Sequence, residues 1–124
     1  MSLAITPVYA ALLTVLFLLL SFRVVFQRNA TKAVFGDGGD LTLMLRIRAD
    51  CNFAEYAPLG LLMLVIAELT GAPGWGLHLG GALLLFGRGL HALALSGIGG
   101  IPFRVGGMIM TFTALLLGAV LAVI

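Results

Sequence analysis

Apolar residues gather along this chain in four long stretches, which are separated by short polar segments. The stretches cover residues 1–22, 53–70, 75–96 and 105–124. A helix that spans a lipid bilayer needs about 20 mostly apolar residues, and each stretch reaches that length with its polar flanks. The pattern therefore predicts an all-α integral membrane protein, built as a bundle of four transmembrane helices.

Turn-forming and capping residues mark the connections between these stretches. Asp40 is placed to cap the second helix after a glycine-rich turn. Residues 71–74 have the Gly-then-Pro order typical of a helix end, and residues 97–102 place Pro102 at the start of the last helix. The first stretch lacks a basic start and is followed at once by Arg23. It is therefore interpreted as a retained helix rather than a secretory signal.

Composition supports a membrane location and a small protomer. The 124 residues are 61% hydrophobic and 10% charged, with a mean hydropathy of +1.18, which lies outside the range of soluble globular domains. Residues 1–124 are expected to form a single domain. A domain this small buries little surface by itself, so oligomerisation is expected. The one cysteine, Cys51, excludes an intrachain disulfide.

Basic residues flank the first and third connections only. They are Arg23, Arg28, Lys32, Arg46, Arg48, Arg88 and Arg104. Because cytoplasmic loops carry the excess of Lys and Arg, both connections are expected in the cytoplasm and both termini on the opposite side. The net charge of +2 follows from this topology and indicates no nucleic-acid partner. Glu68 and His78 are expected to be solvated at the outer surface, and no metal site is predicted.

Polar side chains from three predicted helices meet at one level near the cytoplasmic surface. They are Arg48, Asn52 and Glu55 on the second helix, Arg88 and His91 on the third, and Arg104 at the start of the fourth. The first three share one helical stripe at spacings i, i+4 and i+7, and polar groups at membrane depth indicate a functional site. Such a pocket suits a mostly anionic ligand with one ammonium group. The alternative is that Glu55 pairs with Arg88 or Arg104 and only locks helix packing.

Three segments of the chain resemble motifs of one membrane protein family. Residues 48–58, RADCNFAEYAP, resemble the helix-2 signature Arg-Ala-x-x-Asn-x-x-Glu-x-x-Pro of the MAPEG family, the membrane-associated proteins in eicosanoid and glutathione metabolism. Residues 87–91, GRGLH, resemble its helix-3 segment, and residues 102–104, PFR, resemble the start of its helix 4. The likeness runs from about Arg23 to the C-terminus in the same order, and it resembles a bacterial-type member.

The resemblance implies a homotrimer of four-helix protomers that binds glutathione between neighbouring subunits, near the cytoplasmic side. Asn52 and Glu55 would contact the polar ends of the tripeptide, and Arg104 would stabilise its thiolate. The other residues that the resemblance places at the site are Arg28, Arg48, Tyr56, Arg88 and His91. The implied activity is that of a glutathione transferase or peroxidase acting on a small hydrophobic substrate from the bilayer. A bacterial inner-membrane location is expected.

Three positions depart from the family pattern and leave a second interpretation open. Leu95, Val105 and Met108 stand where better-known members carry hydroxyl side chains. The chain could instead be a non-catalytic trimeric membrane binding or scaffold protein of the same fold. A small proton-coupled exporter is a third interpretation, although such proteins place their acidic residue in the first helix, which has none here.

Overall fold

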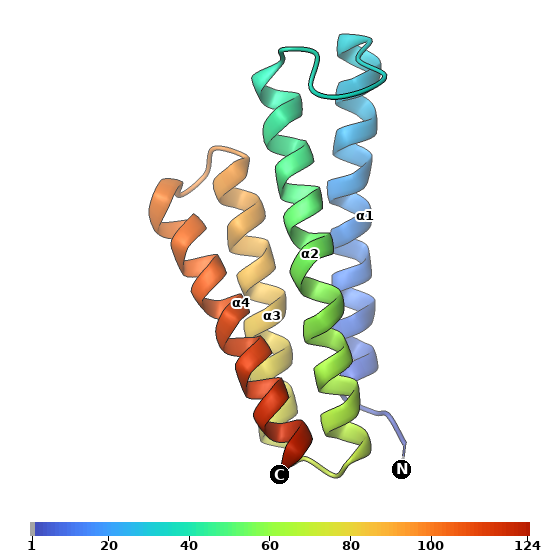
Figure 1. The fold of residues 1–124 in the computed structure, drawn as a ribbon, viewed down its shortest axis with the longest axis vertical. Helices are drawn as coiled ribbons and strands as arrows, with labels where there is room; N and C mark the ends of the chain where they lie inside the picture. The colour runs from blue at the N-terminus through green and yellow to red at the C-terminus, as the bar shows by residue number, and fades with distance from the viewer. Residues whose placement is uncertain (1) are drawn as a thin grey trace.

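The computed structural model of the protein, which describes residues 2–124, consists of four long helices that run up and down the bundle (Figure 1). They are α1 Thr6–Thr31, α2 Leu41–Leu69, α3 Gly74–Leu95 and α4 Gly100–Val123. Each is long and apolar enough to cross a membrane, and no strand occurs in the described part of the chain. The predicted all-α fold with four membrane-spanning helices is confirmed.

Two helix boundaries differ from those expected. α1 continues beyond residue 22 and ends only at Thr31, so Arg23 and Arg28 belong to its last turns. Polar side chains are tolerated there because a helix of this length exceeds the hydrocarbon core of a bilayer. α4 begins at Gly100, before Pro102. The proline is accommodated because the first amides of a helix have no intrahelical partner.

α3 and α4 pack most extensively, α2 packs against all three other helices, and α1 contacts α2 and α3. Figure 1 shows both termini at the same end of the bundle as the α2–α3 connection, opposite the longer α1–α2 connection. Neither the α2–α3 connection nor the segments at the termini carry Lys or Arg. The bundle therefore has one basic and one non-basic end, and the positive-inside rule predicts that the basic end is cytoplasmic.

A glycine contact sets how closely α3 and α4 approach each other. A Cβ atom on Gly107 would lie 2.7 Å from the carbonyl oxygen of Gly87 and 2.7 Å from the amide nitrogen of His91. Helix backbone cannot move aside for a methyl group without shifting the whole helix, so only glycine fits here. The contact holds the part of α3 that carries Arg88 and His91 directly against α4.

Asp40 caps α2, as its place in the sequence predicts. Its Oδ2 atom accepts a hydrogen bond from the amide of Leu43 at 2.8 Å and one from Nε2 of Gln27 at 3.0 Å. These bonds stabilise the carboxylate and hold the pKa of Asp40 below its usual value, with the Leu43 amide as the main cause. Since Gln27 belongs to α1, the same carboxylate also joins the basic ends of α1 and α2.

Glu68 has a structural role at the opposite end of the bundle. Its carboxylate accepts hydrogen bonds from the amides of Ala4, Ile5 and Thr6 at 3.0, 2.8 and 2.8 Å. The expectation that Glu68 is simply solvated at the outer surface is therefore wrong. The first amides of a helix lack intrahelical partners, and this carboxylate supplies one for the start of α1.

Candidate ligand-binding site

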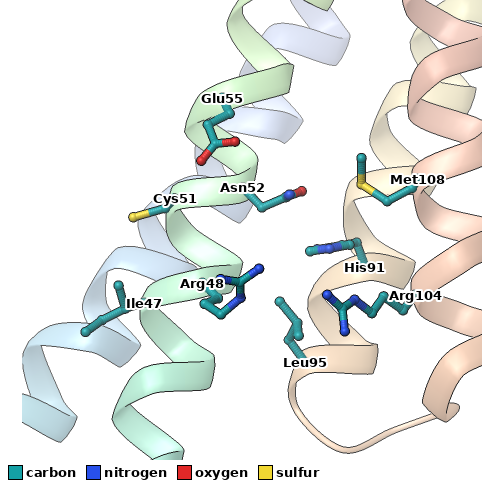
Figure 2. Close-up of a pocket in the computed structure, with 9 residues that line it drawn as sticks. All are labelled: Ile47, Arg48, Cys51, Asn52, Glu55, His91, Leu95, Arg104 and Met108. Atoms are coloured by element: carbon teal, nitrogen blue, oxygen red, sulfur yellow. The ribbon is translucent and has the colours of Figure 1, made fainter. Parts of the chain in front are cut away.

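A pocket of about 420 Å³ lies at the basic end of the bundle, between α2 and the α3–α4 pair (Figure 2). Three helices line it with both polar and apolar side chains. They are Ile47, Arg48, Cys51, Asn52 and Glu55 from α2, His91 and Leu95 from α3, and Arg104 and Met108 from α4. The fold thus brings together five residues that the sequence suggested for a site, namely Arg48, Asn52, Glu55, His91 and Arg104.

The α2 wall of the pocket contains the polar stripe that helical spacing predicts. Arg48, Asn52 and Glu55 follow at i, i+4 and i+7, so they lie one above the other on the helix. Arg48 and Glu55 are exposed, and Asn52 is half-buried. Figure 2 shows Asn52 extending toward α3 and α4, while the thiol of Cys51 extends to the other side of α2. The charged groups therefore stand at the rim and the amide lies deeper.

The opposite wall presents one imidazole and one guanidinium group. His91 is only 5% exposed, and its ring extends from α3 toward α2 (Figure 2). Arg104 lies near the start of α4, is exposed, and extends toward Arg48 across the pocket (Figure 2). The pocket thus combines two guanidinium groups with an imidazole, an amide and a single carboxylate. This excess of positive charge favours an anionic ligand.

Arg88 lies behind the pocket rather than in its wall. Its guanidinium group, 2% exposed, donates Nε to the Thr111 hydroxyl at 3.0 Å, Nη2 to the Met108 sulfur at 3.1 Å and Nη1 to the amide oxygen of Asn52. These three acceptors are neutral, so the guanidinium is not engaged in the Glu55–Arg88 ion pair considered as an alternative. Arg88 instead holds two pocket residues, Asn52 and Met108, in place.

The hydrogen bond from Arg88 decides which end of the Asn52 amide faces the pocket. An amide side chain offers one oxygen acceptor and one NH₂ donor group, and the hydrogen-bond network assigns which is which. Since the oxygen is bonded to Arg88, the NH₂ group is left to donate toward the pocket. The Asn52 NH₂ group is therefore a neutral hydrogen-bond donor for an anion, in addition to the two guanidinium groups of the pocket. Within residues 2–124, no three His, Cys, Asp or Glu side chains gather as metal ligands would.

Tyr56 does not line the pocket but supports Arg88. The guanidinium carbon of Arg88 lies 5.6 Å from the centroid of the Tyr56 ring, within the range of a cation–π contact. The same ring makes an edge-to-face contact with Phe112 of α4, with the centroids 5.5 Å apart. Tyr56 thus joins α2 to α4 beneath the polar network, and any influence on a ligand within this protomer is indirect.

Arg28 lies apart from the pocket of its own protomer. It belongs to the last turns of α1, where its Nη1 atom donates to the carbonyl oxygens of Ala33 at 3.3 Å and Gly36 at 2.7 Å. These bonds fold the α1–α2 connection back onto α1. A separate surface hollow surrounds Arg28, with Lys32 on its rim.

Helical spacing on α4 could have indicated part of the network that the sequence analysis missed. Arg104, Met108 and Thr111 repeat the i, i+4, i+7 spacing of the α2 stripe, so they share one face of α4. Met108, the middle member, is apolar, so the available signal was the i, i+7 spacing of the polar residues Arg104 and Thr111. Ile47 and Cys51 also line the pocket because each directly precedes a member of the α2 stripe.

Comparisons with known proteins agree with these features. The sequence model of the MAPEG family matches residues 6–124. The chain is 36% identical over 87 residues to the inner membrane protein YecN of Escherichia coli strain K12, and to the protein of the same name from strain CFT073. Each match covers 70% of this chain and 66% of the relative, just under two thirds of the relative's length. No solved structure matches the chain significantly.

Fold, motifs and family match therefore agree over nearly the whole described chain. The four apolar helices make it an integral membrane protein, and the similarity to an inner membrane protein confirms the expected location. The family model begins at the first residue of α1 and runs through the end of α4, so it includes every helix of the bundle. The protein belongs to the MAPEG family.

Proposed function

We propose that this protein binds glutathione in the pocket between α2, α3 and α4, and uses its thiolate to attack hydrophobic electrophiles or lipid peroxides. The observation that carries the proposal is the charge pattern of the pocket. Glutathione has two carboxylates and one ammonium group, and the pocket offers two guanidinium groups and one carboxylate. Its volume of about 420 Å³ lies within the usual range for small-molecule sites.

Each polar group in the wall can take a part of the tripeptide. Glu55, exposed at the rim, is suited to the ammonium group, and Arg48 to a carboxylate, which a guanidinium can bind in bidentate fashion. The NH₂ group of Asn52 donates to a carboxylate or peptide oxygen. His91 supplies a ring nitrogen from the deeper wall.

Arg104 is the residue that we assign to the chemistry. The pKa of a free thiol is about 8.5, so only a few per cent is ionised at neutral pH. A guanidinium group close to the sulfur favours the thiolate, which is the nucleophile. The sulfur then bonds to the electrophilic carbon as the leaving group departs with the bonding electron pair. Alternatively it attacks the terminal oxygen of a lipid hydroperoxide: the O–O bond breaks, the sulfur is oxidised to a sulfenic acid, and the alkoxide leaves and takes a proton from water to become the alcohol.

An apolar groove next to the pocket suits the second substrate. It holds about 470 Å³ on the outer face of α4 and is lined by Ile101, Arg104, Val105, Met108, Ile109 and Phe112. Arg104 and Met108 border both the pocket and the groove. Val105 and Ile109 are at least half exposed, so an apolar molecule can enter from the bilayer. A thiolate held at Arg104 would thus meet a hydrophobic electrophile.

The proposal includes assembly into a homotrimer, as the family resemblance implies. Arg48 and Glu55 are exposed in a single protomer, and charged groups facing lipid are costly. A neighbouring subunit that covers the open side of the pocket would remove this cost. Arg28, which is remote from the pocket of its own protomer, could then contact a carboxylate bound next to a neighbour.

A non-catalytic binding protein is the second candidate, and a specific observation favours it. Leu95 and Met108 occupy pocket positions where a hydroxyl would help to activate a thiol, and Val105 borders the groove. The Met108 sulfur is also an acceptor for buried Arg88. Met108 thus contributes to the structure of the bundle and offers no proton donor to a ligand.

Isothermal titration of glutathione into the detergent-solubilised protein tests the proposal. Glu55→Gln should weaken binding about tenfold or more, because it removes the only carboxylate in the pocket wall. Asp37→Asn is the matched control. It also replaces a carboxylate by an amide, but in the α1–α2 connection, and the Asn side-chain oxygen can still accept the hydrogen bond from the Gly39 amide. Absence of binding by folded wild-type protein would overturn the proposal. Binding without turnover of electrophiles or peroxides would favour the second candidate.

A further inference from the structure

A second groove lies between α1 and α3 and shares no residue with the candidate site. It has a volume of about 450 Å³ and is lined by Leu16, Leu19, Leu20, Arg23, Gly89, Ala92, Leu93 and Ser96. Leu20 and Ala92 are buried and form its floor, whereas Leu19 and Leu93 are 57% and 41% exposed and form its edges. From Leu16 to Arg23 the groove follows α1 for roughly 10 Å.

The groove is apolar along most of its length and polar at one end. Arg23 supplies a guanidinium group at that end, beside Ser96, the C-cap of α3, whose hydroxyl donates to the carbonyl oxygen of Ala92 at 2.7 Å. Both belong to the basic end of the bundle, where lipid headgroups begin if α3 spans the hydrocarbon core. The arrangement matches an amphiphile with an anionic head and an apolar chain.

A second guanidinium group strengthens the positive charge beside Arg23. Arg46 of α2 donates Nη1 to the backbone oxygen of Arg23 at 3.2 Å and to Oε1 of Gln27 at 3.3 Å. Both acceptors are neutral, and the Nε atom of Arg46 is buried with no hydrogen-bond partner. Arg46 lies close enough to Asp40 for their charges to interact, so the guanidinium group in the groove that still lacks a nearby carboxylate acceptor is that of Arg23.

Gly89 keeps the groove open on the α3 side. A Cβ atom at this position would meet no protein atom within 4 Å, so the space above the glycine is free. Gly89 is helical and has no left-handed backbone angle, so the helix itself does not require glycine here. A side chain at this position would begin in open space beside the groove.

The carboxylates of the described chain do not suit the basic end of this groove. Four of them accept hydrogen bonds elsewhere: Asp37 from Gly39, Asp40 from Leu43, Asp50 from Ser21, and Glu68 from residues 4–6. The fifth, Glu55, lines the candidate site. Among the described residues no carboxylate is hydrogen-bonded to the Arg23 guanidinium group, and the bilayer supplies anions at this depth.

We propose that the α1–α3 groove binds an anionic phospholipid, with the phosphate against Arg23 and one acyl chain along the leucines of α1. Basic pockets between transmembrane helices at the cytoplasmic side bind anionic headgroups in this way. The bound lipid fills the groove that Gly89 leaves open, and its phosphate neutralises Arg23. The site is independent of glutathione binding.

Native mass spectrometry of the detergent-solubilised protein tests the proposal, with phosphatidylglycerol and phosphatidylcholine of identical acyl chains as probes. Wild-type protein should retain phosphatidylglycerol in preference to phosphatidylcholine. Arg23→Gln should lower the affinity for phosphatidylglycerol about tenfold or more, and Gly89→Leu should do so by filling the groove. Lys32→Gln is the matched control for charge, and Gly106→Leu for size, because a side chain at Gly106 also meets nothing within 4 Å.

Three outcomes would overturn the proposal. Equal retention of both lipids, or retention unchanged by Arg23→Gln and Gly89→Leu, would mean that ordinary lipid contact explains the groove. A change in oligomeric mass caused by Gly89→Leu alone would mean that another subunit covers it. If Arg23→Gln fails to fold, Arg23→Ala and Gly89→Leu still test the charged and apolar ends separately. Glutathione titration of each variant should match wild type.

Discussion

Arg88 of α3 donates a hydrogen bond through Nη1 to the amide oxygen of Asn52 on α2, and this bond links the bundle interior to the pocket. Arg88 is 2% exposed, whereas Asn52 is half-buried in the pocket wall. The buried cation therefore gains an acceptor from a residue whose other polar group faces a ligand. The amide oxygen of Asn52 thus stabilises the bundle, and its NH₂ group is available for ligand recognition. A substitution can change one role without the other.

Replacement of Asn52 by aspartate should separate them. Asn52→Asp keeps an oxygen acceptor for Arg88 and adds an opposite charge, so thermal unfolding in detergent should occur at an unchanged or higher temperature. Glutathione affinity should fall about tenfold or more, because the NH₂ donor is replaced by a second acceptor that carries negative charge. Isothermal titration and thermal unfolding of the same preparation give both values.

The comparison variant is Asn52→Leu, which has a similar size but offers Arg88 no acceptor. It should lower the free energy of unfolding by about 1–3 kcal/mol, since a buried donor is left unpaired, and it should also weaken binding. Wild-type glutathione affinity for Asn52→Asp would show that the amide NH₂ group does not face the ligand.

The contact between α3 and α4 gives a prediction about stability alone. Gly107→Ala should lower the free energy of unfolding by about 1–3 kcal/mol, because its methyl group would lie 2.7 Å from backbone atoms of Gly87 and His91. The adjacent Gly106→Ala places its methyl group in open space and should be neutral or stabilising by up to about 1 kcal/mol. Thermal unfolding of both variants tests this prediction. Equal changes in stability for Gly107→Ala and Gly106→Ala would contradict the close contact between α3 and α4.

The fold could be predicted from the sequence because its main determinants are local. Four apolar stretches with glycine and proline between them define four spanning helices, and Asp40 marks the start of α2. Helical spacing likewise placed Arg48, Asn52 and Glu55 together. The proposals of glutathione as ligand and of a trimer come from the family resemblance, because periodicity and composition specify neither.

Partners between helices could not be predicted in the same way. Arg88 looked like a pocket residue because it precedes His91 by one helical turn, yet its side chain turns inward to neutral acceptors. Glu68 looked like an exposed surface acid, but the start of α1 reaches it from 62 or more residues away in sequence. Such contacts depend on how helices are rotated against each other, which a single-helix pattern does not specify.

The Asp40 cap predicts a pH dependence at the basic end of the bundle. Hydrogen bonds from Leu43 and Gln27 lower the pKa of Asp40 in the folded protein, so its stabilising effect is complete above the unfolded pKa, about 4. The effect is lost as the pH falls through the lower folded pKa. Asp40→Asn should therefore unfold at a lower temperature than wild type at pH 6, and the difference should shrink as the pH is lowered below about 4. Thermal unfolding of both proteins between pH 6 and a pH below about 4 measures this difference. A difference in unfolding temperature that does not change with pH would contradict the role of the Asp40 charge.

Arg104 borders both the polar pocket and the apolar groove, and its proposed role predicts a particular pH dependence of activity. If its guanidinium group stabilises the thiolate, Arg104→Ala should lower kcat/KM for a chlorodinitrobenzene about tenfold or more at neutral pH. The loss should diminish as the pH approaches the free thiol pKa of about 8.5, where ionisation no longer needs help. Arg104→Lys keeps a positive charge and should retain part of the neutral-pH activity.

The pH profile separates thiolate stabilisation from simple binding by Arg104. A loss of activity that is the same at every pH, accompanied by a raised KM, would assign Arg104 to holding a carboxylate. Spectroscopic titration of bound glutathione near 240 nm, where thiolates absorb, checks the same point without turnover: the thiolate signal should appear at lower pH in wild type than in Arg104→Ala. If wild-type protein binds glutathione but shows neither a shifted thiolate titration nor turnover, it is a binding protein. The apolar side chains of Leu95 and Met108 in the pocket would then explain the lack of activity.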